Sequence, residues 1–200
     1  MQSTPSSFRP MRMIEARGVS KRYKSQVVLK DFDFLAERGE FVLLVGANGS
    51  GKTTFLKGLL GLVRFDSGTF LLGSRKIAYV PEKFAFPEFV SLEEFLGLFV
   101  EGEVESLLEE WGLKERRKKD FRKLSKGMRQ KALLLQALHQ DAEILVFDEP
   151  LNGLDKVSVR KFLEELKRLK AEGRTILLCS HSPQIFKKLA DRTVVMEAPE

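Results

Sequence analysis

The sequence predicts an α/β fold in which helices cover both faces of a parallel β-sheet. Three nearly continuous apolar runs have the length of buried strands, and segments of helical spacing alternate with them. Strands that are apolar on both faces and alternate with helices are typical of parallel sheets. A glycine-rich turn follows the first run, as in folds that bind phosphate at the end of a strand. The runs are Phe41–Val45, Ile144–Phe147 and Thr175–Cys179.

The segment before the first apolar run predicts additional strands. Met13–Ala16 and Val27–Leu35 have strand-like spacing, the second with alternating apolar and polar residues. Tyr23 lies between them on a polar turn, where its ring could pack against the protein or stack on a base. Residues 1–12 hold prolines, serines and arginines without the apolar core of a secretory signal, so we expect a loose tail.

The turn after Phe41–Val45 matches the phosphate-binding pattern G-x-x-x-x-G-K-[ST] without a gap. The segment Thr54–Leu60 has helical spacing, so the motif lies between a strand and a helix, as this pattern requires. Glycines allow backbone N–H groups and the positive end of the helix to point at one phosphate. Lys52 is then placed to reach the β- and γ-phosphates, and the Thr53 hydroxyl to ligate Mg²⁺. We predict a nucleoside triphosphate site formed by Gly46, Ala47, Asn48, Gly49, Ser50, Gly51, Lys52, Thr53 and Thr54.

The middle of the chain interrupts the alternation of strands and helices. After two short strands come three segments of helical spacing, the first of which opens with the capping-box pattern Ser91-Leu92-Glu93-Glu94. We expect these helices to form a lobe inserted at about residues 84–140. The strands are Thr69–Leu72 and Lys76–Val80, and the helices are Ser91–Val100, Val104–Trp111 and Met128–His139.

The run Lys114–Lys123 is the most basic part of the chain. A nucleic-acid patch normally interleaves several aromatic side chains with its charges, and here only Phe121 does so. We interpret the run as a solvated surface, with contact to anionic lipid head groups as the alternative. The whole chain has a net charge of +6, which permits an acidic partner without requiring one.

Two consecutive carboxylates, Asp148 and Glu149, end the second apolar run. Burying charge there is unfavourable unless a cation or a donor offsets it, and Mg²⁺ would supply that offset. We expect Asp148 to hold the metal through its water shell and Glu149 to polarise the water that attacks the γ-phosphate. His181 follows the third run, where its imidazole could contact the γ-phosphate or orient Glu149. Since ligands collect at the carboxyl ends of parallel strands, these side chains should meet the phosphate-binding turn.

The last part of the chain predicts an amphipathic helix, Lys156–Lys170, with a Glu164–Arg168 ion pair, and a short strand, Thr193–Met196. The single cysteine, Cys179, lies in an apolar strand, so we interpret it as an inert core thiol in a reducing compartment. No run approaches the ~18 apolar residues that span a bilayer. We therefore expect a cytoplasmic protein that works at a membrane only through another polypeptide.

Further segments resemble those of the ATP-binding subunits of ABC transporters, and the resemblance extends from Met13 to Met196. The most specific segment is Leu124–Gln130, which is similar to the family signature LSGGQ. The resemblance implies a P-loop NTPase fold with a parallel core sheet, an N-terminal antiparallel β subdomain and an inserted helical subdomain. It also implies a single ATPase domain over residues 13–196. The other matching segments are Leu154-Asp155 for the D-loop, Ser180-His181 for the H-loop and Tyr23 for the adenine-stacking A-loop aromatic.

The family mechanism, carried over to these positions, implies hydrolysis of ATP with Mg²⁺ in a pair of cassettes. Two cassettes close head to tail, and each ATP lies between the phosphate loop of one and Ser125 and Gly127 of the other. The resemblance further implies a transmembrane permease as partner, a peripheral location at the cytoplasmic face of the membrane, and no nucleic acid. The implied catalytic residues are Glu149, His181 and Lys52, and the implied metal ligands are Thr53, Asp148 and Glu82.

Some positions depart from the family pattern. Glu82 stands where the family has the Q-loop glutamine; it can still offer an oxygen to Mg²⁺, but its charge differs. Lys126 and Met128 replace signature residues. These variants resemble those of cassettes that serve small exporter-type permeases, which favours export over import.

Two other functions are compatible with a phosphate loop. A soluble ABC-type ATPase acting on nucleic acid or ribosomes generally carries paired cassettes or long coiled-coil arms, whereas this chain has one phosphate loop and no sustained heptads. A P-loop kinase would pass the phosphoryl group to a metabolite, and the signature segment and His181 argue against it. Release of phosphate to water without a phosphorylated product would exclude the kinase.

Overall fold

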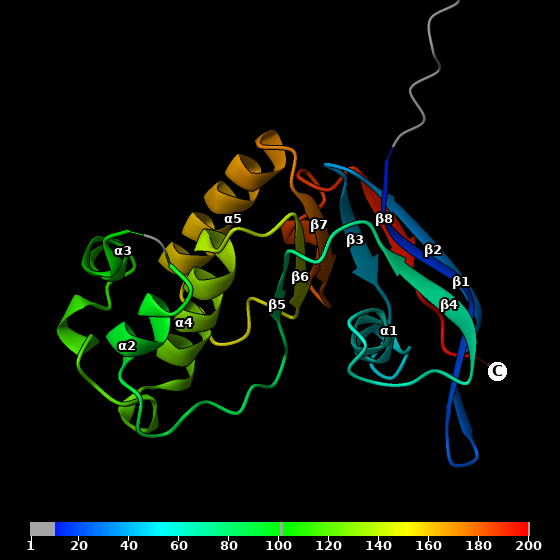
Figure 1. The fold of residues 1–200 in the computed structure, drawn as a ribbon, viewed down its shortest axis with the longest axis horizontal. Coiled ribbons are helices and arrows are strands. Elements are labelled where there is room, and N and C mark those ends of the chain that lie inside the picture. Colours follow the sequence, from blue (N-terminus) through cyan, green and yellow to red (C-terminus); the bar gives the residue numbers. More distant parts are fainter. Residues whose placement is uncertain (1–10, 101, 200) are drawn as a thin grey trace, which may run out of the picture.

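The computed structural model describes residues 11–100 and 102–199 and contains a larger and a smaller β-sheet (Figure 1). The strands of the larger sheet are β3 (Phe41–Val45), β5 (Ile77–Val80), β6 (Ile144–Asp148), β7 (Thr175–Cys179) and β8 (Arg192–Val195). Their order is β5-β6-β7-β3-β8, and every pairing is parallel. The predicted parallel sheet is therefore confirmed.

The smaller sheet is antiparallel and forms from the N-terminal part of the chain. Its strands are β1 (Arg12–Tyr23), β2 (Gln26–Glu37) and β4 (Ser67–Leu72), in the order β2-β1-β4. This sheet is the antiparallel unit that the family resemblance implied.

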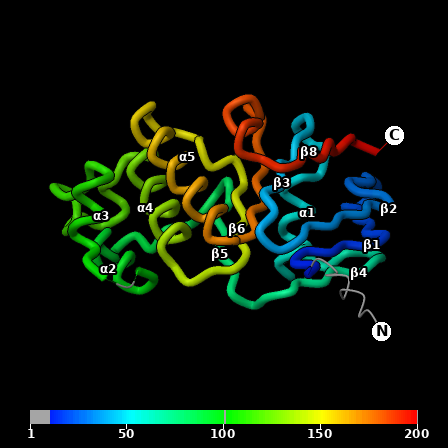
Figure 2. Tube along the Cα trace, turned by 90° about the horizontal axis from the view of Figure 1, so that it is seen from above, coloured from blue at the N-terminus to red at the C-terminus, as the bar shows by residue number. Residues whose placement is uncertain are grey.

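Helices lie on both faces and at one end of the parallel sheet. Within the described residues they are α1 (Lys52–Leu59), α2 (Leu92–Gly97), α3 (Val104–Glu110), α4 (Lys126–His139) and α5 (Lys156–Ala171). Figure 2 shows α2, α3 and α4 gathered at one end of the molecule and α1 with the antiparallel sheet at the other. Among residues 11–100 and 102–199, no helix combines the length and the hydropathy that crossing a bilayer requires.

Two hydrophobic cores explain why the central strands are apolar at every position. Successive side chains of a strand point to opposite faces of the sheet. In β3, Phe41 and Leu43 pack in one core, together with residues of α4 and α5. Val42 and Leu44 pack in the other, together with residues of α1 and of the antiparallel sheet. Because both faces are buried, a polar residue on either face would be desolvated.

Strand β1 is much longer than the predicted Met13–Ala16. It pairs with β2 on one side and β4 on the other, and register shifts after Ala16 break its alternation of buried and exposed residues. Gly18 has φ 54, which adds an irregularity that the pattern could not reveal. The predicted tail of residues 1–12 is wrong at its end, since Arg12 begins β1 and pairs with Glu37. Residues 1–10 lie outside the described residues.

Helix α2 is shorter than the predicted Ser91–Val100. Its capping box is confirmed, because Ser91 Oγ accepts a hydrogen bond from Glu94 N and Glu94 Oε2 accepts one from Ser91 N. The helix ends at Gly97, a poor helix former, and Val100 then turns into the core with 8% of its surface exposed.

The other predicted elements differ from the structure by at most two residues at either end. Three one-turn 3₁₀ helices were not predicted: Lys114–Arg116, Phe121–Lys123 and Pro183–Ile185.

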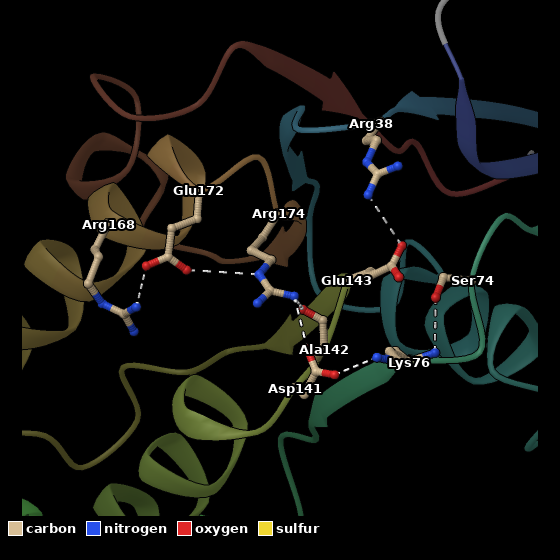
Figure 3. Close-up of polar contacts among 9 residues, drawn as sticks. All are labelled: Arg38, Ser74, Lys76, Asp141, Ala142, Glu143, Arg168, Glu172 and Arg174. Atoms are coloured by element: carbon tan, nitrogen blue, oxygen red, sulfur yellow. Dashed lines mark hydrogen bonds and ion pairs between the residues drawn. The ribbon is translucent and has the colours of Figure 1, made fainter. Parts of the chain in front are cut away.

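Charged side chains form a network at the amino ends of the parallel strands, opposite the ends that carry the sequence motifs (Figure 3). Asp141 lies 2.5 Å from Lys76 Nζ and 3.4 Å from Arg174 Nη1, and Glu143 lies 3.7 Å from Arg38 Nη2. These pairs are largely solvent-exposed, so each contributes little to stability. They connect the segments that lead into β3, β5, β6 and β7.

The predicted ion pair between Glu164 and Arg168 is wrong. Arg168 instead contacts Glu165 at 2.8 Å and Glu172 at 2.5 Å, and Figure 3 shows the second contact. Glu164 lies 3.9 Å from Arg160, one turn earlier. The three acidic candidates lie within one turn of Arg168, and spacing alone did not distinguish between them.

His139, in the last turn of α4, predicts a pH dependence of stability. Its Nε2 is buried without a hydrogen-bond partner among the described residues, and burial lowers its pKa below 6.5, with Arg168 acting in the same direction and Glu165 and Glu110 opposing. The unfolded chain therefore binds this proton more readily, and the free energy of unfolding should fall as the pH drops below 6.5.

We expect the loss to be well below the limit of about 1.4 kcal/mol per pH unit for one proton, because water partly screens the half-buried ring. Urea unfolding of the wild type and of His139→Gln at pH 7.5 and pH 5.5 measures it. The wild type should lose more stability than the variant over this range, and equal losses would contradict the assignment.

Candidate active site

A cavity of about 600 Å³ lies at the carboxyl ends of β3, β6 and β7 and brings the separated sequence motifs together. The phosphate-binding turn, the two acids after β6 and the histidine after β7 all contribute to its walls. This convergence was predicted from the order of strands and motifs. The lining residues are Tyr23, Gln26, Val28, Asn48, Gly49, Gly51, Lys52, Thr53, Thr54, Glu82, Asp148, Glu149, Asn152 and His181.

The phosphate-binding turn leaves backbone donors available to a ligand. Helix α1 begins after Gly51, which has φ 92 and provides no side-chain cap for the N–H groups of the first turn. An added Cβ at Gly46 would lie 2.3 Å from the Met196 carbonyl oxygen and 2.5 Å from Ser50 Oγ, so only glycine fits there. Lys52 Nζ donates to the carbonyl oxygens of Gly46 and Ala47, at 2.8 and 3.0 Å. The helix dipole, the N–H groups and one ammonium group therefore favour an anion at this point.

Asp148 is a buried acid whose two carboxylate oxygens have no hydrogen-bond partner among the described residues. Only 1% of its surface is exposed. Burial raises its pKa to about 6, and the negative charges of Glu82 and Glu149 add to this effect, while the Thr53 hydroxyl and the Lys52 ammonium oppose it. A buried, unpaired carboxylate is unfavourable unless a cation offsets it.

The donors around Asp148 fit a magnesium ion. Glu82 and Thr53 line the same cavity and add a carboxylate and a hydroxyl, both oxygen ligands that this ion prefers. In the part of the chain that the structure describes, no three His, Cys, Asp or Glu side chains are grouped as a metal site. Mg²⁺ commonly binds through one or two carboxylates with phosphate and water completing its shell, so this donor set is sufficient.

Glu149 and His181 are in direct contact. The distance from His181 Nδ1 to Glu149 Oε2 is 2.6 Å, and the Glu149 side chain is 13% exposed. Of the two roles considered for His181, the geometry favours orientation of Glu149. The backbone of Glu149 has φ 50, a left-handed conformation that is uncommon for this residue type, and its N–H donates to the Cys179 carbonyl oxygen at 3.0 Å.

Tyr23 lines the cavity from the antiparallel sheet, where it ends β1 and does not lie on a turn as predicted. The residue is 45% exposed, and Lys21 Nζ lies 4.9 Å from the centroid of its ring. A large, exposed aromatic surface at the rim can stack on a base.

Sequence reasoning missed three lining residues: Gln26, Val28 and Asn152. Gln26 and Val28 are two apart on β2, so they share a face of the strand; the pattern could have revealed them once Tyr23 was assigned to the site. Asn152 lies in the turn after the two acids, where its N–H donates to the Glu149 carbonyl oxygen at 3.3 Å.

Ser125 and Gly127 do not line this cavity. Ser125 caps α4, since its Oγ accepts a hydrogen bond from Met128 N at 3.3 Å. An added Cβ at Gly127 would lie 2.5 Å from the Gly153 carbonyl oxygen, so the start of α4 packs directly on the backbone of the loop after β6.

Side-chain contacts reinforce the packing between α4 and the loop after β6. The buried Gln130 donates from Nε2 to the Pro150 carbonyl oxygen at 3.0 Å. Lys131 Nζ lies 2.8 Å from Asp155 Oδ2. The signature segment is therefore held against the loop that follows Glu149.

The cavity thus combines an anion cradle, a buried acid suited to a divalent cation, and a carboxylate oriented by an imidazole. A water molecule deprotonated by such a carboxylate can attack a phosphoanhydride whose leaving group is held by the cradle. The arrangement supports hydrolysis of a nucleoside triphosphate. A carboxylate oriented in this way is suited to activate water as the nucleophile.

Comparison with known proteins agrees with this chemistry. Residues 29–152 match the family described as ABC transporter. A protein named as the uncharacterized ABC transporter ATP-binding protein YthP of Bacillus subtilis is 36% identical, over 92% of this chain and 81% of its own length. The zinc import ATP-binding protein ZnuC of a Ruegeria species is 32% identical, over 93% of this chain and 78% of its own length.

Two further similarities concern transport direction and fold. The Nod factor export ATP-binding protein I of Burkholderia lata is 34% identical, over 94% of this chain and 69% of its own length. A solved structure described as the ATP binding subunit of an ABC transporter is 32% identical and has a TM-score of 0.84, over 92% of this chain and 86% of that one. The similar proteins thus include both import and export ATPases.

Proposed function

Because the chain belongs to the ABC transporter family of ATP-binding proteins, which hydrolyse ATP to drive transport, we propose that it energises a separate membrane permease. We also propose that residues 13–196 act as one ATPase domain, with the helices of residues 84–140 as its inserted subdomain. The chain would then sit at the cytoplasmic face of the membrane, bound to the permease.

The residue roles follow from the cavity. The N–H groups of the phosphate-binding turn and the Lys52 ammonium bind the phosphates, and Tyr23 stacks on the adenine. Thr53, Asp148 and Glu82 would hold Mg²⁺, which when bound neutralises charge on the β- and γ-phosphates. Glu149 accepts a proton from the attacking water, and His181 holds Glu149 in position through the 2.6 Å contact.

The observation that carries the proposal is that Ser125 and Gly127, the most specific part of the resemblance, lie outside the cavity that holds the other motifs. Ser125 is the N-cap of a 14-residue helix, and the N–H groups of the first helical turn favour an anion. Ser125 and Gly127 do not line the nucleotide cavity of the same chain. A second cassette facing the first would use them. We therefore propose a head-to-tail pair in which each Ser125 contacts the ATP of its partner, two-fold symmetric if the chain pairs with itself.

Replacing Ser125 by arginine is expected to lower ATP turnover about a hundredfold, the size of effect seen when a transition-state donor is lost. ATP binding to the monomer should be almost unchanged, because Ser125 does not line the nucleotide cavity. Steady-state phosphate release and equilibrium binding of a fluorescent ATP analogue measure the two quantities. Ala171→Arg, which adds the same charge at the exposed end of α5, is the matched control. Unimpaired turnover in Ser125→Arg would contradict the paired site.

A permease contact is supported by apolar side chains exposed between β5 and α3. Phe89 and Leu98 are each 75% exposed, and Phe84 and Phe99 are 43% and 37% exposed. Clusters of exposed apolar side chains mark interaction sites. We propose that the permease docks on the region Glu82–Val100.

The basic run Lys114–Lys123 gives little support to a nucleic-acid function. Lys114 pairs with Glu109 at 2.9 Å, Arg117 lies 3.6 Å from Glu105, and Lys123 lies 3.5 Å from Asp120. Cations that are paired with carboxylates of their own chain present less positive charge to a phosphate backbone. The interpretation as a solvated surface is therefore retained.

We propose export as the direction of transport. The support is the pair of signature variants Lys126 and Met128, which resemble those of cassettes that serve exporter-type permeases. ATP-driven substrate movement in vesicles containing the chain and its permease would test the direction, and accumulation on the cassette side would contradict export.

The whole proposal is tested by purifying the tagged protein from detergent-solubilised native membranes and identifying the polypeptides that accompany it. A multi-span membrane protein is the expected partner, and its recovery should fall when Phe89 and Leu98 are both changed to serine. Recovery of ribosomes or nucleic acid without a membrane protein would overturn the transporter role.

A further inference from the structure

A second cavity, of about 610 Å³, lies on the hairpin formed by β1 and β2. It shares no lining residue with the nucleotide cavity. On β2, Gln26 and Val28 line the nucleotide cavity, whereas Val27, Leu29 and Lys30 line the second one. The second cavity is thus a separate feature. Its lining residues are Ser20, Lys21, Arg22, Lys24, Val27, Leu29, Lys30 and Asp66.

The lining of the second cavity is strongly basic. Four cationic side chains and one carboxylate face it, which leaves a net positive charge of three. The carboxylate, Asp66, already accepts a hydrogen bond from the backbone N–H of Arg22 at 2.6 Å and lies 3.7 Å from Lys21 Nζ. Among the described residues, Arg22, Lys24 and Lys30 have no carboxylate within ion-pair distance. The described residues therefore supply no ion-pair partner for these three exposed cations.

The cavity has an ordered wall and an apolar floor. The Lys21 side chain is only 14% exposed and is held between Asp66 and the ring of Tyr23. Leu29 is 3% exposed and, with Val27, supplies apolar surface. Ser20 Oγ accepts a hydrogen bond from Asp31 N at 3.0 Å, so its own proton remains available to donate.

The two-residue turn of the hairpin begins with Lys24, at a position where the backbone conformation favours glycine or asparagine. Lys24 has φ 54, a left-handed conformation that glycine or asparagine adopts at lower free energy. A cation at this position therefore carries a backbone penalty, and its side chain adds to the charge of the cavity. The two-residue turn between β1 and β2 accounts for this conformation.

We propose that this cavity binds a small, soluble organic phosphate that carries two or more phosphate groups. The net charge of three matches the charge of such an anion, and phosphate oxygens accept hydrogen bonds from guanidinium, ammonium and hydroxyl donors together. The apolar floor provides contact for the organic part. A concave cavity takes a discrete molecule, whereas a membrane surface or a nucleic-acid backbone would require a more extended basic face.

The test uses inorganic tripolyphosphate as the probe and the full chain carrying Lys52→Ala, which removes the ammonium of the nucleotide cavity. Binding is measured by isothermal titration calorimetry at low salt, before and after adding Arg22→Gln and Lys30→Gln together. We expect the double change to weaken binding by about tenfold or more for each charge-assisted hydrogen bond lost. Circular dichroism checks that each variant is folded.

The matched control adds Lys167→Gln and Lys187→Gln, which remove the same charge from exposed positions outside the cavity. Its affinity should stay within about twofold of the parent, because isolated exposed charges at a distance are screened by salt. Equal weakening in both double variants would show general electrostatic attraction and overturn the site. Binding to phosphatidylglycerol vesicles without binding to tripolyphosphate would also overturn it, in favour of a lipid contact. The design requires no ATP hydrolysis, so it is independent of the proposed function.

Discussion

Replacing Glu149 by glutamine is expected to lower ATP turnover by at least about a hundredfold, the typical contribution of a general base. Glutamine keeps the size of the side chain and can still contact His181, but it cannot accept the proton of the attacking water. The phosphate-binding turn, Lys52 and Tyr23 are unchanged, so ATP should still bind. Because the paired state would persist until ATP is hydrolysed, the variant should accumulate as a dimer when ATP and Mg²⁺ are present.

Phosphate release, equilibrium nucleotide binding and size-exclusion chromatography with light scattering measure these three effects of Glu149→Gln. The control is Glu115→Gln, which makes the same chemical change on an exposed side chain that does not line the cavity. Wild-type turnover in Glu149→Gln would show that another group activates the water. Loss of ATP binding together with turnover would instead indicate damage to the cavity.

Replacing Lys52 by alanine is expected to weaken ATP binding by roughly a hundredfold or more, since charge-assisted hydrogen bonds to the phosphates are lost. In the structure the ammonium group is held over the turn by the carbonyl oxygens of Gly46 and Ala47. The positive charge is therefore already positioned beside the N–H groups of α1. The variant removes the only lysine or arginine side chain among the described residues that line the cavity.

Titration of a fluorescent ATP analogue measures the effect of Lys52→Ala, and circular dichroism checks that the variant is folded. Lys57→Ala, which removes an exposed lysine from the same helix, is the control and should bind ATP normally. Retention of tight binding by Lys52→Ala would mean that the backbone donors alone hold the phosphates. That result would remove Lys52 from the proposed mechanism.

The sequence predicts best those parts of the site whose structure depends on a few consecutive residues. The phosphate-binding turn has a fixed spacing of glycines and lysine because a few consecutive backbone groups must surround one phosphate. Asp148 was recognised because two charges at the end of an apolar strand require compensation, and its buried, unpartnered oxygens agree with that reasoning. Strands β3 and β7 were predicted with their observed bounds, because both faces of each strand are buried.

The parts that the sequence could not predict depend on contacts between distant segments. The length of β1 depends on its pairing with both β2 and β4, and register shifts disguise its pattern. The contact between His181 and Glu149, which supports one of the two roles considered for the imidazole, joins residues 32 apart in the chain. Gln26 and Val28 carry no chemical signal of their own, and only the placement of the hairpin beside the phosphate-binding turn brings them into the cavity.

The direct backbone contact between Gly127 and Gly153 couples the start of α4 to the loop after β6. With no side chain between them, and with Gln130 and Lys131 fastening the same two segments, neither segment can shift without displacing the other. Within the proposed pair, a movement of the loop behind Glu149 after hydrolysis would be transmitted to the segment that faces the other subunit's nucleotide. Hydrolysis in one subunit would then change the structure around the nucleotide of the other subunit. The two ATP molecules would therefore be hydrolysed in correlated events.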